Sequence, residues 1–223
     1  MSRYCAVVAG KRAEGLLEMM LFIELYTLNR AWSGLTDEEL LWDPMPGAWT
    51  VQPREKCQTA TPFVVGAWAA DFDADLAASA YQGKAIEPLT SIAWLFWHVG
   101  SQPARTAELD FLGGAHTAES GWTSPYIAAH PIFTTAGEAV ASMRAGWRAL
   151  EAALRSATDE RLERPTRFWG YGGQPGPMGT GAQVISSVLN EVSHHGTQIG
   201  VLRDLYRLRA SVSIERYAAL WGE

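Results

Sequence analysis

Four stretches of the chain repeat apolar residues at the spacing of an α-helix, and this periodicity limits the possible folds more than any other feature. No stretch shows the alternation of apolar and polar residues that is typical of a half-buried strand. Four long helices in 223 residues predict one all-α domain, residues 1–223, folded as a four-helix bundle. The predicted helices cover residues 13–32, 89–111, 135–155 and 182–209.

Local signals indicate where these helices start and bend. Three residue pairs have the spacing of a capping box, in which each side chain bonds to the backbone N–H of the other residue. Pro103 lacks the N–H that would bond one turn back, so we expect a kink in the second helix shortly after His98. The capping pairs are Thr36 with Glu39, Thr135 with Glu138, and Thr180 with Gln183.

A long irregular loop, residues 42–73, lies between the first two predicted helices and is rich in Pro, Gly and Trp. A loop of this length inside one domain is usually functional or packed against the body of the protein. One interpretation is that its aromatic and acidic residues form a lid or line a pocket. The other, which we favour, is that they pack the loop against the bundle. The residues concerned are Trp49, Trp68, Phe72, Asp71 and Asp73.

The composition excludes several classes of partner. The formal net charge is −6 and no basic patch is large enough to bind a row of phosphates, so nucleic acid is not expected. Glu18 and Glu24 interrupt the apolar stretch 16–28, which argues against a membrane span. The two cysteines, Cys5 and Cys57, form no CxxC motif, and the N-terminal apolar run is too short for a secretory leader. We therefore expect a cytoplasmic protein.

Polar residues interrupt the apolar face of the fourth predicted helix. Positions spaced alternately by four and three residues share one face of a helix. This series is apolar at both ends, while its middle holds a carboxylate, an imidazole and an amide. Burying such groups without partners would cost about 1–3 kcal/mol for each neutral group and more for the charge. The series is Val184, Val188, Glu191, His195, Gln198, Leu202 and Leu205.

A divalent metal ion bound between two helices would satisfy this cluster. Glu191 and His195 lie on adjacent turns and point the same way, as do metal ligands in the cores of helical bundles. The third candidate ligand is His98, the only polar side chain in the apolar stretch IAWLFWHV. Two His and one carboxylate leave coordination positions open for water or substrate, which is typical of catalytic rather than structural sites.

Other interpretations of these polar residues remain open. His98 alone is typical of a hydrogen-bonded core histidine, and Glu and His four residues apart also form ordinary surface pairs. His194 points about 100° away from His195, so both cannot serve one ion, and we favour His195. Gln198 either orients a ligand or is an amide at a helix interface. The other polar residues considered are Arg203 and Asp204, expected in surface or inter-helix ion pairs, and His116 and His130, expected in a loop.

Three segments of the chain resemble the DinB/YfiT-like superfamily, which includes the mycothiol-dependent maleylpyruvate isomerases. They read LTDEELLWDPMPGAWTV, TSIAWLFWHVG and NEVSHHGTQIGVLRDLY, occur in the superfamily's order and span most of the chain. The resemblance implies a four-helix bundle with a divalent metal near one end of its core. Carried over by motif, the metal ligands fall on His98, Glu191 and His195. Many relatives have a third His where this chain has Glu191, and the isomerase branch has the His, Glu and His set.

The resemblance also implies metal-dependent chemistry on a small molecule. Thiol-dependent transfer or isomerisation is the leading hypothesis, with a low-molecular-weight thiol as cosubstrate because neither cysteine lies near the motif. The alternatives are a metal-dependent hydrolase and a stress-associated protein that binds metal or a small ligand without turnover. Zinc or nickel is the expected metal, while iron and manganese also suit three nitrogen and oxygen ligands. The broad apolar face of the first helix predicts a homodimer, although a buried core helix explains this face equally well.

Overall fold

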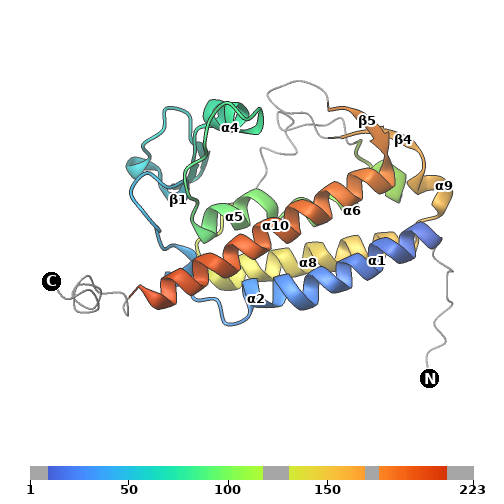
Figure 1. The fold of residues 1–223 in the computed structure, drawn as a ribbon, viewed down its shortest axis with the longest axis horizontal. Coiled ribbons are helices and arrows are strands. Elements are labelled where there is room, and N and C mark those ends of the chain that lie inside the picture. The colour runs from blue at the N-terminus through green and yellow to red at the C-terminus, as the bar shows by residue number, and fades with distance from the viewer. Residues whose placement is uncertain (1–9, 118–130, 169–175, 210–223) are drawn as a thin grey trace, which may run out of the picture.

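The computed structural model describes residues 10–117, 131–168 and 176–209, and most of these residues are helical. The long helices α1, α8 and α10 run along the molecule (Figure 1), and the shorter α5 and α6 contact both α8 and α10. The predictions of helix in 13–32, 135–155 and 182–209 are confirmed. The helices are α1 (Lys11–Ile23), continued by the π-helical η1 (Glu24–Leu28) and by α2 (Asn29–Trp32), then α3 (Asp37–Leu40), α4 (Ala74–Tyr81), α5 (Ile92–Val99), α6 (Gln102–Ala107), α8 (Ala136–Arg155), α9 (Asp159–Leu162) and α10 (Gly181–Leu208).

The predicted second helix, 89–111, is two helices in the structure. Helix α5 begins after Ser91, whose hydroxyl accepts a hydrogen bond from the backbone N–H of Trp94, and it ends at Val99. Pro103 lies in the first turn of α6, where a missing N–H leaves no helical hydrogen bond unmade. The prediction of a kink within one continuous helix is therefore wrong, because the proline starts a new helix instead.

Two glycines allow the helices to approach each other closely. A Cβ atom added to Gly196 of α10 would lie 2.7 Å from the Cγ2 atom of Thr27 in η1. One added to Gly146 of α8 would lie 2.9 Å from the backbone nitrogen of Ala104 in α6. Both distances are shorter than a van der Waals contact, so a larger residue would push the helices apart.

Capping at the predicted pairs is nearly as expected. Thr36 with Glu39 and Thr180 with Gln183 form complete capping boxes at the starts of α3 and α10. Thr135 accepts a hydrogen bond from the backbone N–H of Glu138 at the start of α8. Its hydroxyl also donates to the Glu138 carboxylate, so the two side chains bond to each other at this helix start.

The prediction of an all-α fold is wrong in detail, because the protein is mostly helical but also contains small antiparallel sheets. The segment 42–73 holds a three-stranded sheet in the order β1-β3-β2, which contacts α5. A second pair of strands lies beside the start of α10. Strands of three or four residues are too short for a period of two to stand out among Pro and Gly. The strands are β1 (Thr50–Pro53), β2 (Phe63–Val65), β3 (Trp68–Asp71), β4 (Pro165–Arg167) and β5 (Met178–Thr180).

Residues of the long loop that were candidates for a lid make packing contacts. Asp71 is 5% exposed, and its carboxylate accepts hydrogen bonds from the side chain of Gln52 and from the backbone N–H groups of Gln58 and Thr59. These bonds hold the pKa of Asp71 below its ordinary value, although burial alone would raise it. Asp73 caps the start of α4. These contacts agree with the packing interpretation that we favoured.

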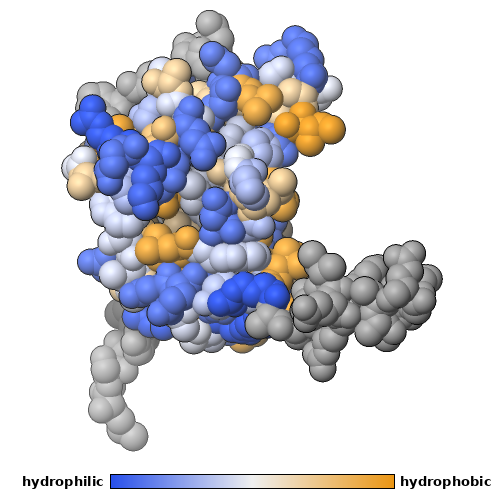
Figure 2. All heavy atoms as spheres, turned by 90° about the vertical axis from the view of Figure 1, so that its left-hand side faces the viewer, coloured by the Kyte–Doolittle hydropathy of each residue, from blue (hydrophilic) through white to orange (hydrophobic). Residues whose placement is uncertain are grey.

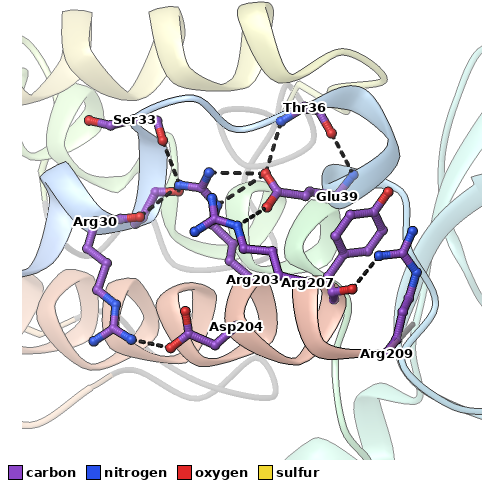
Figure 3. A network of polar contacts seen from close by, with 10 residues as sticks. Arg30, Ser33, Thr36, Glu39, Arg203, Asp204, Arg207 and Arg209 are labelled. Atoms are coloured by element: carbon purple, nitrogen blue, oxygen red, sulfur yellow. Dashed lines mark hydrogen bonds and ion pairs between the residues drawn. The ribbon is translucent and has the colours of Figure 1, made fainter. Parts of the chain in front are cut away.

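A buried ion pair joins the end of α10 to α3 (Figure 3). The guanidinium of Arg203 donates to the Glu39 carboxylate at 3.0 Å and 3.2 Å, and both side chains are less than 5% exposed. The same guanidinium donates to the backbone carbonyls of Arg30, Ala31 and Ser33 at the end of α2. Arg203 is therefore in an inter-helix ion pair, one of the two predicted alternatives, and is not at the surface.

Glu39 is the carboxylate on which this network converges. It accepts hydrogen bonds from Arg203, from the side chain of Arg207 and from the backbone N–H of Thr36. Burial alone would raise its pKa, but these hydrogen bonds and the two positive charges outweigh burial and hold the pKa below its ordinary value. Asp204 forms an exposed inter-helix ion pair with Arg30. Hydrophilic side chains cover most of this end of the molecule (Figure 2).

The first helix is apolar on two faces. Its inner face is buried in the core, whereas its outer face leaves five large apolar side chains exposed. The homodimer stays a prediction, and this outer face is the surface that it would cover. None of the helices in the described ranges is long and apolar enough to cross a bilayer. The exposed residues are Met19, Leu21, Phe22, Leu25 and Tyr26.

Replacing Arg203 by Met should lower the free energy of unfolding by about 3–5 kcal/mol, because it leaves a buried carboxylate and three carbonyls without a main partner. Arg30→Met is the matched control. It breaks an ion pair whose side chains are 63% and 45% exposed, and should cost less than about 1 kcal/mol. Urea unfolding measures both values. Equal losses in the two variants would contradict the importance of the buried pair.

The lowered pKa of Glu39 predicts a pH-dependent stability. Its contribution is fully present above the pKa of Glu in the unfolded chain, about 4.3, and is lost as the pH falls through the lower pKa of the folded state. Glu39→Gln should therefore be less stable than the wild type at pH 7, with a difference that narrows below about pH 4. Urea unfolding between pH 7 and pH 3 tests this, and a difference that does not change with pH would contradict it.

Candidate metal centre

The three predicted ligands come together between α5 and α10. Glu191 and His195 lie one turn apart on α10, and His98 lies in the last turn of α5. The Oε2 atom of Glu191 lies 3.3 Å from Nε2 of His195 and 3.9 Å from Nε2 of His98. All three ligand atoms fall within 4.8 Å of one another. Within residues 10–117, 131–168 and 176–209, no other three His, Cys, Asp or Glu side chains form such a group.

This donor set fits a divalent metal ion. With bonds of about 2.0–2.2 Å, two ligands of a tetrahedral zinc ion lie roughly 3.3–3.6 Å apart. The separations from Glu191 to the two imidazoles, 3.3 and 3.9 Å, are close to that range, so only a small shift of His98 would be needed. Two nitrogens and one oxygen also suit nickel, iron or manganese, so the geometry does not select one metal.

The cluster lies at the edge of the core and is accessible from one side. The side chain of His195 is 11% exposed and that of His98 is 19% exposed, whereas that of Glu191 is 39% exposed. The carboxylate is therefore the ligand nearest to solvent.

Gln198 fixes the orientation of His195. The Nδ1 atom of His195 lies 2.6 Å from Oε1 of Gln198. Because an amide oxygen is only an acceptor, Nδ1 carries the proton in this bond, and Nε2 is the nitrogen that faces Glu191. Orientation of an imidazole through its second nitrogen is the usual arrangement around metal-binding histidines. Of the two roles considered for Gln198, the structure has the hydrogen bond to the candidate ligand His195.

The electrostatics of the cluster favour an ionised carboxylate at Glu191. The hydrogen bond with His195 holds the pKa of Glu191 below its ordinary value, and the nearby imidazoles act in the same direction, while burial opposes them. Burial and the neighbouring His195 lower the pKa of His194, against the effect of Glu191. Near neutral pH, Glu191 is therefore ionised and His194 is uncharged.

The other histidines and the cysteine within the described residues lie outside the cluster. His194 is exposed, and although its ring centroid lies 3.9 Å from that of His195, it is not one of the three grouped ligands. His116 lies 3.6 Å from the carboxylate of Glu108. Cys57 is half-buried and not in a disulfide. Cys5 and His130 lie outside the described residues.

The predicted series of core-facing positions on α10 does not stay buried toward the end of the helix. Leu202 is buried as predicted, but Gln198 and Leu205 are exposed. A repeat of alternating three and four residues drifts by about 20° every seven residues from a straight helix. Arg203 projects from a different face of the helix, the one that carries the buried Ile185, Val192 and Ile199, and is 2% exposed. Sequence reasoning missed this buried arginine because it followed one face too strictly.

Substituting any of His98, Glu191 or His195 by Ala should weaken metal binding by more than about 100-fold, since loss of a residue that merely orients a ligand already costs 10–100-fold. His194→Ala is the matched control and should bind like the wild type, at about one ion per chain. Elemental analysis of untagged protein, incubated with zinc or nickel and desalted, measures the metal content, and circular dichroism checks the helices. Metal retained by all three ligand variants would contradict the assignment.

Comparison with known protein families gives a match over the part of the chain that carries the candidate ligands. A sequence model of the DinB superfamily matches residues 67–199, which is more than half of the chain and includes His98, Glu191 and His195. No curated protein and no solved structure shows a significant match. The matched region extends from the last strand of the three-stranded sheet into α10, so it contains α5 and the part of α10 that carries the candidate ligands. The chain belongs to the DinB superfamily.

Proposed function

We propose that this protein is a divalent-metal-dependent enzyme that transfers a thiol to, or isomerises, a small electrophilic molecule. The observation that carries the proposal is the convergence of His98, Glu191 and His195 from two helices, with ligand atoms within 4.8 Å of one another. Zinc or nickel is the proposed metal. The combination of His, Glu and His supports a relation to the mycothiol-dependent isomerase branch that the sequence resembles.

The packing of the long helices supports the four-helix bundle implied by the resemblance. In this arrangement α1 with α2 forms one row, α5 with α6 a second, and α8 and α10 the other two. The candidate ligands then lie between two neighbouring rows, at the last turn of α5 and about the middle of α10. The small sheets lie outside these rows.

The residues around the cluster have separate roles in the proposed reaction. Gln198 holds His195 with Nε2 toward the site, and Glu191 supplies a negative charge at the exposed side. A divalent ion bound here would lower the pKa of a thiol or water and so supply a nucleophile near neutral pH. His98 and His195 are mostly buried, which limits the access of water to the inner side of the site.

Cys57, the cysteine that lies within the described residues, is a poor source for the nucleophilic thiol. Burial raises the pKa of Cys57, and the nearby carboxylates of Asp71 and Glu55 raise it further, against the effect of Arg54. Its sulfur lies 3.9 Å from the carbonyl oxygen of Pro53, in the segment that holds the three-stranded sheet. A thiol that stays protonated at neutral pH is a weak nucleophile. This supports a low-molecular-weight thiol as cosubstrate.

The test is a panel of small electrophiles and esters, assayed with the zinc- or nickel-loaded protein in the presence and absence of low-molecular-weight thiols. We expect saturable turnover that needs both metal and thiol, and a loss of kcat/KM of more than about 100-fold in Glu191→Ala, since binding of the metal fails. Cys57→Ser is the control for the source of the thiol and should keep wild-type activity.

Two outcomes of this panel would replace the proposed reaction. Hydrolysis of esters at a rate that does not depend on added thiol would identify a metal-dependent hydrolase, with water as the nucleophile. Stoichiometric metal without saturable turnover on either class of substrate would indicate a protein that binds metal or a small ligand and is not an enzyme.

A further inference from the structure

The candidate ligand His98 is stacked on the aromatic ring of Trp94. The two residues are one turn apart on α5, and their rings are nearly parallel, with an interplanar angle of 16° and centroids 4.9 Å apart. A face-to-face stack restricts the rotation of the imidazole, because turning the ring out of plane would drive its edge into the indole. The orientation of His98 is thus tied to the position of Trp94.

Trp94 is itself held in place by the three-stranded sheet and its flanking segments. Its ring centroid lies 5.4 Å from that of Trp49 and 6.0 Å from that of Phe72, and Trp94 is 5% exposed. Trp49 precedes β1, and Phe72 follows β3. The backbone of Trp49 is bonded to the start of α5, where its N–H donates to the Leu89 carbonyl and its own carbonyl accepts from the N–H of Ser91. The segments that flank the sheet therefore pack against Trp94.

Ring packing, and not hydrogen bonding, fixes the indole of Trp94. Its Nε1 atom is buried and has no hydrogen-bond partner within the part of the chain that the structure describes. An unpaired buried N–H is unfavourable, so the indole is not held there by its polar group. Its contacts with Trp49, Phe72 and His98 account for the position.

We propose that Trp94, supported by Trp49 and Phe72, is a positioning residue that orients His98 for metal binding. The proposal rests on the metal centre of the proposed function. Metal-binding histidines need a fixed ring orientation, which residues outside the ligand set commonly provide. For His195 this is the hydrogen bond from Nδ1 to Gln198, and for His98 it is the stack on Trp94. The three-stranded sheet thereby supports a ligand of the site, although it supplies none itself.

The test is the zinc dissociation constant of the full-length protein, measured after metal removal by competition with a chromogenic chelator. Trp94→Leu should weaken zinc binding by about 10–100-fold, as is usual when a group that orients a ligand is lost. Trp94→Phe keeps a flat aromatic face and should stay within about threefold of the wild type. Trp147→Leu is the matched control. It removes a Trp that is equally buried, at 2% exposed, but lies on α8 among other residues, and its dissociation constant should not change.

The outcomes separate this proposal from the proposed function. Zinc binding by the wild type and by Trp94→Leu with equal affinity would overturn the role of Trp94 and leave the metal centre standing. An absence of zinc binding in the wild type would overturn both. If Trp94→Leu does not fold, NMR of the wild-type protein, labelled at histidine, provides the test. The indole should shift the ring protons of His98 upfield of those of His116, both with and without zinc. Unshifted His98 protons would overturn the stack.

Discussion

Helix α10 packs against several other helices and against the small sheet beside its start, so the polar side chains that it buries constrain much of the structure. It contacts α1, α2, α5, α6 and both strands of the small sheet beside its start. Near its end, Arg203 is neutralised by Glu39 and bonded to the carbonyls of α2, and so needs nothing from outside the chain. Two to three turns earlier, Glu191 and His195 form a group with His98 whose ligand atoms lie within 4.8 Å of one another. The contacts of Arg203 anchor α10 to α2 and α3. The group of Glu191, His195 and His98 makes α10 part of a candidate metal site.

The long helices and the three ligands could be predicted from the sequence because both follow from helical periodicity. A carboxylate and an imidazole in an apolar series indicate burial at a polar site, and His98 stands out among its apolar neighbours for the same reason. The small sheets and α4 were missed because short strands, and a short helix whose cap is an ordinary Asp, leave little periodic signal. The burial of Arg203 was missed because it depends on the carbonyls of another helix, which no local pattern contains.

The aromatic residues of the irregular segment show how a region without ligands contributes to a site. Trp49 and Phe72 were considered as parts of a lid, but they pack on Trp94, which stacks on His98. Trp49 also lies outside the region that matches the superfamily model, residues 67–199. The support of His98 is therefore partly built from a segment that the family match does not include, and relatives with a different segment there would have to orient this ligand in another way.

The most direct test of the central claim is X-ray absorption spectroscopy of the protein loaded with one equivalent of zinc. The account predicts a shell of nitrogen and oxygen ligands with the multiple-scattering pattern of two imidazoles, and the loss of one imidazole in His98→Ala. A zinc spectrum with sulfur ligands, or one that is the same in the wild type and in His98→Ala, would show that the metal binds elsewhere. The cluster of His98, Glu191 and His195 would then be a hydrogen-bonded core group.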